Sequence, residues 1–253
     1  MHNTKINVII NGSSGKMGKE AMNAVSKDAE LNLVAGLNRT DNLAAAIKKY
    51  NTKDNPVVVV DLTSSECVFE NAKTIITHNA CPVIGSSGLL ESDTKDLQQL
   101  ASDYKVNGII VPNFSLGAVL MMHFSSIAAK FYDQVEIIER HHSDKLDSPS
   151  GTALRTADLI AKNLLPHASN DKKRHETVAQ ARGANYKNIP IHSIRLNGSC
   201  GHQSVMFGGA DEGLTISHDS LHRASFMPGV ILACKKANTQ NGLVVGLEHL
   251  LNI

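Results

Sequence analysis

One stretch of the sequence, residues 136–153, concentrates side chains that carry acid–base chemistry. It reads EIIERHHSDKLDSPSGTA, and positions 139–145 alone hold two acids, one arginine, two histidines and one lysine. Core packing does not explain these charges. Histidine changes its protonation near neutral pH, and lysine offers a compact positive charge to an anion. We therefore predict an acid–base loop that follows a short apolar strand at residues 135–138.

A helix is predicted to begin directly after this loop, at Gly151. Ser150 is a candidate N-cap, and apolar residues then recur at helical spacing as far as Leu164. The first N–H groups of a helix have no acceptor within it and lie at the positive end of its dipole, so they suit a carboxylate or a phosphate. We predict that Ser150, Gly151 and Thr152 form an anion-binding turn beside the acid–base loop.

A second candidate anion site is the glycine-rich turn at residues 12–18, which links an apolar strand at 5–11 to an amphipathic helix. Glycines there allow a tight bend, a close backbone approach to a pyrophosphate and close packing of the helix on the strand. The spacing is G-x-x-G-x-x-G, with Ser14 in place of the usual second glycine, and a structural turn explains the motif alone about as well. The predicted dinucleotide contacts are Gly12, Ser13, Ser14, Gly15, Lys16 and Met17.

The end of the next predicted strand, residues 31–37, bears on the choice of cofactor. It lies about twenty residues after the turn, where dinucleotide-binding proteins commonly place an acid that contacts the ribose. Here Asn38 and Arg39 occupy that position and are predicted to contact the cofactor. An acid would repel a 2′-phosphate, whereas arginine pairs with it, so the sequence favours NADPH over NADH. The alternative is that Arg39 is a solvated surface residue.

The N-terminal half alternates between strand and helix patterns, which predicts a parallel sheet with right-handed crossovers. Ligands of such sheets bind beyond the carboxyl ends of the strands, and small, polar residues follow the strands here. Strands are expected at 56–62, 82–85 and 108–111, and helices at 43–50, 66–78 and 93–104. The predicted cofactor contacts at the later strand ends are Gly85, Ser86, Ser87, Val111, Pro112, Asn113 and Phe114.

The pattern changes at residue 116. The predicted fold class is α/β, with a Rossmann-type doubly wound parallel-sheet domain at 1–114 and 222–253. A second, α+β domain at 115–221 is predicted to bind substrate and to contain a mixed, open sheet, which favours a homo-oligomer. Its expected elements are a helix at 116–131, a polar interval without periodicity at 166–188, and strands at 189–196, 202–208 and 214–218. Two further helices, at 226–236 and 243–251, are expected to return to the first domain.

The composition excludes several classes of partner. The chain has 253 residues, and its 25 Lys and Arg against 24 Asp and Glu give a net charge of +1. No overall field therefore favours nucleic acid or an anionic membrane. The lack of Trp and the 4% aromatic content also argue against a base-stacking surface. No leader segment or membrane-spanning run is recognisable, so we expect a cytoplasmic protein.

Metal and disulfide chemistry are not expected. The four cysteines lie far apart without a C-x-x-C pair, and neither H-x-H nor H-E-x-x-H spacing occurs. The cysteines are therefore predicted to be buried free thiols. The histidines on predicted strands, His192, His202 and His218, are interpreted as structural residues with satisfied hydrogen bonds.

Over nearly its whole length the chain resembles the 4-hydroxy-tetrahydrodipicolinate reductase (dihydrodipicolinate reductase) family. The family pattern E-x-x-E-x-H-x-x-x-K-x-D-x-P-S-G-T-A is matched at ten positions between Glu136 and Ala153. Weaker matches follow the family order at the glycine turn and at residues 61–63, 85–88, 112–117 and 201–202.

The resemblance implies NAD(P)H-dependent reduction of a cyclic imine dicarboxylate, with loss of water, in the diaminopimelate route to lysine. It also implies an inserted substrate domain that forms a homotetramer. In this family His141 would protonate the ring as hydride arrives, Lys145 would be its partner acid, and His142 would help residues 150–152 to hold a substrate carboxylate. Ser143 and Asp144 stand where many relatives have basic residues, so we expect a lower affinity for the dianion.

Several alternatives stay open. Glu139 and Asp147 either orient His141 and Lys145 or form simple surface salt bridges. Arg195 and Arg223 could assist the dianion, but nothing in their local sequence decides this. Rival functions are another two-domain Rossmann oxidoreductase with an amino-acid-like substrate, or a nucleotide-sensing module without catalysis. The histidine–lysine loop followed by Pro-Ser-Gly-Thr disfavours both rivals.

Overall fold

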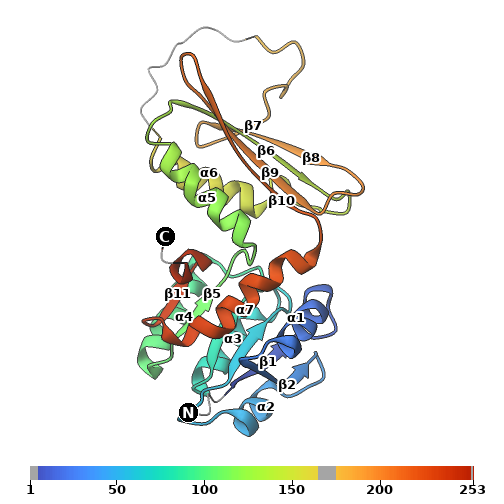
Figure 1. The fold of residues 1–253 in the computed structure, drawn as a ribbon, viewed down its shortest axis with the longest axis vertical. Helices are drawn as coiled ribbons and strands as arrows, with labels where there is room; N and C mark the ends of the chain where they lie inside the picture. Colours follow the sequence, from blue (N-terminus) through green and yellow to red (C-terminus); the bar gives the residue numbers. More distant parts are fainter. Residues whose placement is uncertain (1–4, 165–174, 252) are drawn as a thin grey trace. The chain divides into compact units, whose positions relative to one another are not determined.

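The computed structural model describes residues 5–164, 175–251 and 253, and Figure 1 shows its helices and strands. The chain divides into two compact units. Unit 1 comprises Met1–Leu116 and Arg223–Ile253, and unit 2 comprises Gly117–His222. Unit 2 is therefore inserted between two segments of unit 1.

Unit 1 is built on a six-stranded sheet in the order β11-β5-β4-β3-β1-β2, and all of its pairings are parallel. In β3, near the centre, Val58, Val59 and Val60 are buried. Consecutive β-branched residues of this kind suit a strand that is covered on both faces. The strands are β1 (Ile6–Asn11), β2 (Leu31–Leu37), β3 (Val58–Asp61), β4 (Cys81–Ile84), β5 (Gly108–Ile110) and β11 (Leu243–Val245).

Two groups of helices cover this sheet. Helices α2, α3 and α4 pack in sequence and share a buried cluster with the strands that includes Ile9, Ile47, Ile75 and Leu97. Helices α1 and α7 pack on each other, and α7 also contacts β1 and β3 (Figure 1). The predicted Rossmann-type doubly wound sheet is confirmed. The helices are α1 (Lys16–Lys27), α2 (Leu43–Tyr50), α3 (Val68–Thr77), α4 (Glu91–Tyr104) and α7 (Met227–Lys236).

Unit 2 contains a five-stranded sheet in the order β10-β9-β6-β8-β7. Strand β6 pairs parallel with β8 and antiparallel with β9, so the sheet is mixed, as predicted. Helices α5 and α6 lie together on one side of it (Figure 1). The elements are α5 (Leu116–Ala128), β6 (Gln134–His141), α6 (Gly151–Ala161), β7 (Ala184–Tyr186), β8 (Ile189–Arg195), β9 (Gly201–Gly208) and β10 (Gly213–Ser220).

Alternation along the strands gives the sheet of unit 2 a covered face and an open face. Ile137 and Glu139 of β6 are fully buried, whereas Ile138 between them is only half-buried. On the same face as Ile138, Ile194 and Met206 leave 43% and 44% of their surface exposed. The open face therefore presents apolar side chains that the helices of the unit do not cover.

The prediction of a helix at residues 243–251 is wrong. Leu243–Val245 forms strand β11 beside β5, and Leu247–Leu250 forms only a 3₁₀ turn. Gly246 separates them with a φ of +110°, a backbone conformation outside the helical region. The leucine spacing that suggested a helix is therefore divided between an edge strand and a turn.

The boundary predicted for the acid–base loop is also wrong. The strand expected at 135–138 continues to His141, so Glu139 and His141 belong to β6 and not to a loop. Pairing with β8 on one side and β9 on the other outweighs the polarity of these residues. Of the polar interval predicted at 166–188, residues 184–186 form the short strand β7, and residues 166–174 lie outside the described part of the chain.

The predicted burial of the cysteines holds for only two of them. All four are free thiols, and Cys81 and Cys234 are buried, but Cys67 and Cys200 are half-buried. Cys67 lies in the turn before α3, where the hydroxyls of Ser64 and Thr63 lower the pKa of its thiol by hydrogen bonding. The exposure of Cys67 follows from its position beside a polar strand end and not from its residue type.

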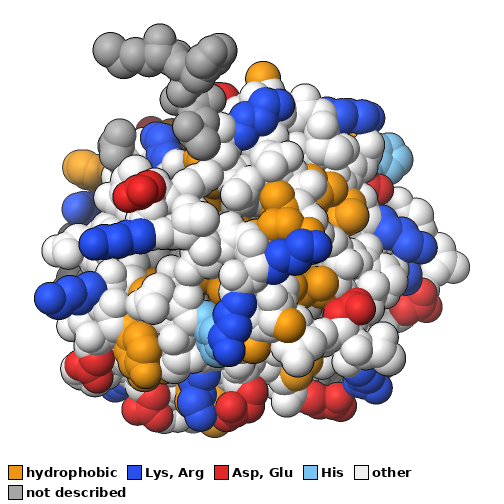
Figure 2. Space-filling view, turned by 90° about the horizontal axis from the view of Figure 1, so that it is seen from below, with side chains coloured by type: hydrophobic (Ala, Val, Ile, Leu, Met, Phe, Trp, Pro, Cys, Tyr) orange, Lys and Arg blue, Asp and Glu red, His pale blue; other side chains and the backbone are white. Residues whose placement is uncertain are grey.

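The surface charges are mixed. On the face shown in Figure 2, Lys and Arg alternate with Asp and Glu and do not gather into a basic field. This distribution agrees with a net charge of +1. In the described part of the chain, no helix is both long enough and apolar enough to cross a membrane.

Candidate active site

The glycine turn lies at the carboxyl end of β1 and leads into α1. Gly12 has a φ of +90°, and a Cβ on it would lie 2.6 Å from the carbonyl oxygen of Leu62. Gly18 has no room for a Cβ either, because the carbonyl group of Gly12 occupies that space. These two glycines are needed for the bend and for the close approach of α1 to the strand end.

The N-terminus of α1 has the features that an anion requires. Its N-cap is Gly15, which makes no side-chain hydrogen bond to the helix. The N–H groups of Lys16 and Met17 open the helix and have no acceptor within it. With the positive end of the helix dipole behind them, these groups fit the pyrophosphate of a dinucleotide.

Asn38 supports the glycine turn from the end of β2. Its Oδ1 accepts hydrogen bonds from the N–H of Ser14 at 2.9 Å and from the hydroxyl of Ser13 at 3.2 Å. The next residue, Arg39, is 89% exposed, and its guanidinium lies 3.7 Å from the carboxylate of Glu66. Glu66 follows β3 and was not among the predicted cofactor residues. The strand end therefore carries an exposed ion pair. Such a pair is weak, so an anion of higher charge can displace the Glu66 carboxylate from Arg39.

Asp61, at the end of β3, connects several loops at the carboxyl edge of the sheet. Its side chain is fully buried. It accepts hydrogen bonds from Asn11 (2.9 Å), Asn71 (2.8 Å), Thr63 (2.7 Å) and Ser86 (2.5 Å). These donors come from the end of β1, from α3, and from the segments that follow β3 and β4. Asp61 thereby fixes the positions of three neighbouring strand ends.

The remaining predicted cofactor residues lie at the ends of β4 and β5. Gly85 packs against the ring of Phe114, which occupies the space that a Cβ would need. Phe114 and Val111 are buried, so their side chains are not available to a ligand. Pro112 and Ser87 are exposed, and the side chain of Asn113 accepts a hydrogen bond from the N–H of Ser115 at 2.8 Å. The edge of this site is therefore mainly backbone and small side chains.

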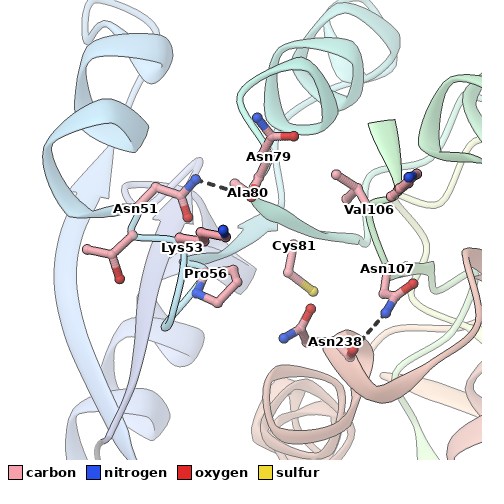
Figure 3. A pocket seen from close by; sticks show the side chains of 11 residues that line it. Asn51, Lys53, Pro56, Asn79, Ala80, Cys81, Val106, Asn107 and Asn238 are labelled. Carbon is pink, nitrogen blue, oxygen red and sulfur yellow. Dashed lines mark hydrogen bonds between the residues drawn. The ribbon is translucent and has the colours of Figure 1, made fainter. Parts of the chain in front are cut away.

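A cavity at the opposite end of the same strands has a different role. It measures about 410 Å³ and is lined mainly by residues between α2 and β3, α3 and β4, and α4 and β5, with Cys81 of β4 and Asn238 (Figure 3). Asn51 donates to the carbonyl oxygen of Asn79 at 3.1 Å, and Asn107 donates to that of Asn238 at 3.0 Å. These side chains satisfy carbonyl groups where helices end. The cavity lies away from the carboxyl edge at which ligands of doubly wound sheets bind.

In unit 2 the side chain of Glu139 is fully buried and has three partners from different elements. Nδ1 of His141 lies 2.5 Å from Oε2 of Glu139. The guanidinium of Arg195, at the end of β8, donates to both carboxylate oxygens at 3.0 Å each. The backbone N–H of Ser150 donates to Oε1 at 3.3 Å. Glu139 therefore joins β6, β8 and the start of α6, and it is not a surface salt bridge.

The charge of Glu139 is fixed by these partners. Burial would by itself raise the pKa of Glu139, but the hydrogen bonds from His141 and Arg195 outweigh burial and lower the pKa to about 2. The carboxyl group is consequently ionised at neutral pH. A buried charge of this kind is stable only when it is paired, and Arg195 provides the permanent countercharge.

Lys145 and Asp147 form an ion pair in the loop that follows β6. Nζ of Lys145 donates to the two carboxylate oxygens of Asp147 at 2.7 and 2.8 Å, and this interaction is the main cause of the lowered pKa of Asp147. Nη2 of Arg195 donates to the backbone carbonyl of Asp147 at 2.6 Å. Arg195 therefore links the loop to Glu139, and its two terminal nitrogens are already engaged. It is a structural residue of the site and not a free cation for a substrate.

The start of α6 is capped and open. Ser150 is buried, and its Oγ accepts a hydrogen bond from the N–H of Ala153 at 3.2 Å, which confirms the predicted N-cap. A Cβ placed on Gly151 would have no other atom of the described chain within 4 Å. The space beside the first N–H groups, those of Gly151 and Thr152, is therefore accessible to an anion.

Three more residues that the sequence singled out, His142, Ser143 and Asp144, follow in the loop after β6. His142 is half-buried, and its carbonyl oxygen accepts the N–H of Lys145 at 3.2 Å. Ser143 donates its hydroxyl to Oδ1 of Asn197 at 2.5 Å and so ties the loop to the turn between β8 and β9. The side chain of Asp144 is exposed.

The structure groups the predicted residues into two sites, one in each unit. It adds Asp61 to the first. In the second, Glu139 contacts His141, which was one of its two alternatives, and Arg195 contacts Glu139. The spacing of Glu139 and His141, two residues apart, places both on one face of a strand and is the signal that links them. No local signal identifies Arg195, because its contact with Glu139 crosses between strands. Among the described residues, no group of three His, Cys, Asp or Glu side chains is placed to hold a metal.

A nucleotide-binding sheet of Rossmann type and an inserted domain with an acid–base site define a two-domain oxidoreductase. The chain belongs to the dihydrodipicolinate reductase family. The family models described as "Dihydrodipicolinate reductase, N-terminus" and "Dihydrodipicolinate reductase, C-terminus" match residues 6–114 and 117–251, respectively.

Curated relatives match the chain over nearly its full length. A 4-hydroxy-tetrahydrodipicolinate reductase from Legionella pneumophila is 47% identical over 250 residues, which cover 96% of this chain and 98% of that protein. One from Syntrophomonas wolfei is 43% identical over 263 residues, which cover 98% and 99%. The two proteins carry the same name as the family that the motif of residues 136–153 resembles.

Solved structures separate the family from the fold. A dipicolinate-bound dihydrodipicolinate reductase from Paenisporosarcina sp. TG-14 is 40% identical, with a TM-score of 0.83 over 97% of this chain and 99% of that chain. An amine dehydrogenase from Mycobacterium smegmatis has a TM-score of 0.67 but is only 10% identical, covering 98% and 96%. The second likeness shows a shared fold and nothing about the reaction.

Proposed function

We propose that the protein reduces 4-hydroxy-tetrahydrodipicolinate to tetrahydrodipicolinate, with loss of water and with NAD(P)H as reductant, in the diaminopimelate route to lysine. The observation that carries this proposal is the hydrogen-bonded pair of His141 and buried Glu139 beside the open start of α6. An acid–base group next to an anion site is what reduction of a cyclic dicarboxylate requires of the protein. The family membership supplies the identity of the dicarboxylate.

The residues of unit 1 fit a nicotinamide dinucleotide. The uncapped start of α1 would hold its pyrophosphate, and the segments ordered by Asp61 would face the rest of it. The bound cofactor supplies the hydride. The protein's own contribution is to orient the substrate, to exclude water and to deliver a proton.

His141 is the residue that we propose delivers the proton to the ring. Its side chain is 20% exposed, so it is shielded from bulk water but accessible to a ligand. Histidine is suited to this task because it changes protonation near neutral pH. Lys145 would act as its partner acid.

The two carboxylates of the substrate would be bound by positive charge and backbone donors. We propose that the N–H groups at the start of α6, the hydroxyls of Ser150 and Thr152, and His142 hold one carboxylate. Lys145 would face the other, although its pairing with Asp147 reduces the charge it can offer. The loop also carries Asp144, which supports the expectation of a lower affinity for the dianion.

For the cofactor we propose a preference for NADPH over NADH. Arg39 is exposed at the end of β2, and the residue before it is Asn38 and not an acid. A 2′-phosphate carries more charge than the carboxylate of Glu66 and accepts a bidentate arginine, so it would replace that weak ion pair.

We also propose that copies of the chain associate through the open sheet face of unit 2 to form a homotetramer in the cytoplasm. The exposed apolar residues Ile194 and Met206 on this face support association, since burying them would remove apolar surface from water. Light scattering of the purified protein would measure the assembly directly.

The proposed reaction is tested by an assay with freshly generated 4-hydroxy-tetrahydrodipicolinate, following oxidation of NADPH and NADH separately. We expect both to be oxidised, with NADPH having the higher kcat/KM. Oxidation of neither cofactor would overturn the proposed reaction and favour the rivals. A matched reaction with an amino-acid-like 2-oxo acid and ammonia would detect a dehydrogenase of the rival class.

A further inference from the structure

We propose that Glu139 is a positioning residue that, with Arg195, fixes which nitrogen of His141 exchanges protons. This inference rests on the proposed role of His141 and extends it to two residues that do not touch the substrate. In this arrangement Nδ1 is the permanently protonated nitrogen and Nε2 is the nitrogen that gives and takes the proton.

The first step of the argument is geometric. An ionised carboxylate only accepts hydrogen bonds, so Nδ1 of His141, 2.5 Å from Oε2 of Glu139, must carry a hydrogen. In the neutral ring the other nitrogen, Nε2, is then the proton acceptor. Because Glu139 and His141 lie two residues apart on one face of β6, the strand itself holds the pair together.

The second step concerns the space at Nε2. Gly201 of β9 pairs with His141, and a Cβ added there would lie 3.6 Å from Nε2. That edge of the ring therefore faces a residue without a side chain. The Nδ1 edge faces a buried carboxylate, so the two edges of the imidazole have different surroundings and different roles.

The third step concerns charge. A buried carboxylate is stable only when a countercharge or hydrogen-bond donors are paired with it. Arg195 donates two hydrogen bonds to Glu139, and the N–H of Ser150 adds another. Because Arg195 is a permanent cation, the buried charge of Glu139 stays paired whether or not the imidazole carries a second proton.

The same strand carries a matched pair on its opposite face. Oε2 of Glu136 lies 2.8 Å from Nε2 of His192, and Arg182 also contacts Glu136. This group has the same residue types as the pair at His141, but it is on the open face. Glu136→Gln therefore changes a carboxylate–histidine pair on β6 without touching His141.

The main test compares Glu139→Gln with Glu136→Gln in the reductase assay. Glutamine keeps the shape of Glu139, but its amide can donate as well as accept, so the orientation of His141 is no longer specified. We expect kcat to fall about 100-fold while the KM for the dicarboxylate changes less than about 3-fold, because a proton donor acts in the transition state. Glu136→Gln should keep the wild-type kcat per subunit.

The proposal is overturned if Glu139→Gln retains kcat within about 3-fold, or if KM rises as much as kcat falls, since the latter indicates a merely structural role. A second measurement depends neither on the folding of Glu139→Gln nor on reductase activity. Nitrogen NMR of the wild-type protein labelled at histidine, with the His141 signal assigned by its loss in His141→Gln, reports which ring nitrogen is protonated in the neutral form. Protonated Nδ1 supports the proposal, and protonated Nε2 overturns it. Absence of any reductase activity would refute the proposed function but leave the NMR result valid.

Discussion

Asp61, which ends β3 in unit 1, and Glu139, which lies near the end of β6 in unit 2, are both fully buried carboxylates, but their partners differ in kind. Asp61 is surrounded by amides and hydroxyls, from Asn11, Asn71, Thr63 and Ser86. Glu139 is bound by a guanidinium and an imidazole. Neutral donors fix the positions of a carboxylate and of the loops around it, whereas a titratable partner can exchange a proton. The contrast separates the scaffold of the proposed cofactor site from the proposed acid–base site.

The largest effect that this contrast predicts is on His141. We expect His141→Gln to lower kcat about 10³-fold with little change in substrate KM, because glutamine keeps polarity but cannot donate a proton in the transition state. Steady-state kinetics with saturating NADPH would measure it. Near-normal turnover would remove His141 from the reaction and erase the proposed difference between the two carboxylates.

Asp61→Ala should act mainly on folding. It leaves four donors facing an empty space, and we expect the free energy of unfolding to fall by about 3–5 kcal/mol. Urea unfolding monitored by circular dichroism would measure the loss, with the exposed Asp96→Ala in α4 as control. A loss no greater than that of the control would show that the neutral network contributes little.

The pH dependence of stability measures the contribution of ionised Glu139 to the fold. The pKa of Glu139 is about 2 in the folded protein against an ordinary 4.5, so its ionised form stabilises the fold above pH 4.5. This contribution, about 3 kcal/mol at most, should disappear as the pH falls from 4.5 toward 2. Unfolding at several pH values should show the loss in wild type and in Glu136→Gln, but a weaker dependence in Glu139→Gln. Identical dependence of stability on pH in all three proteins would contradict the proposed contribution of Glu139.

A smaller effect concerns the charged edge of unit 1. Arg39→Ala should weaken NADPH binding about 10-fold and NADH binding little, because only NADPH has the 2′-phosphate that pairs with arginine. Glu66→Gln should move affinity the other way by freeing Arg39 from its ion pair. Fluorescence titration with each cofactor would measure both variants. Equal losses for the two cofactors in Arg39→Ala would mean that Arg39 does not bind the phosphate.

Gly151→Ala is expected to have the smallest effect on the fold and a specific effect on binding. No protein atom in the described chain opposes a methyl group there, so the melting temperature should stay near that of wild type. A substrate carboxylate at the start of α6 would meet the methyl group, and we expect KM to rise about 5-fold or more, a cost of about 1 kcal/mol. An unchanged KM would place the carboxylate elsewhere.

Much of the fold could be predicted from periodicity because its elements are locally determined. The valines before Asp61 specify a buried strand, and Gly12 and Gly18 are required by the bend and by the approach of α1. The exception is residues 243–251, where helical leucine spacing competes with pairing to β5. Pairing depends on a partner strand more than a hundred positions away in the chain, and no local pattern contains that information.

The sequence by itself determined the residue types of the acid–base segment, its order, the N-cap at Ser150 and the family to which these belong. Only the tertiary structure decided that Glu139 is buried, that His141 ends a strand, and that Arg195 balances the charge of the Glu139 carboxylate. The physical reason is that propensity and capping act between neighbours in the chain. Burial and charge pairing instead depend on which strands meet, and β6 and β8 bring together residues 56 positions apart.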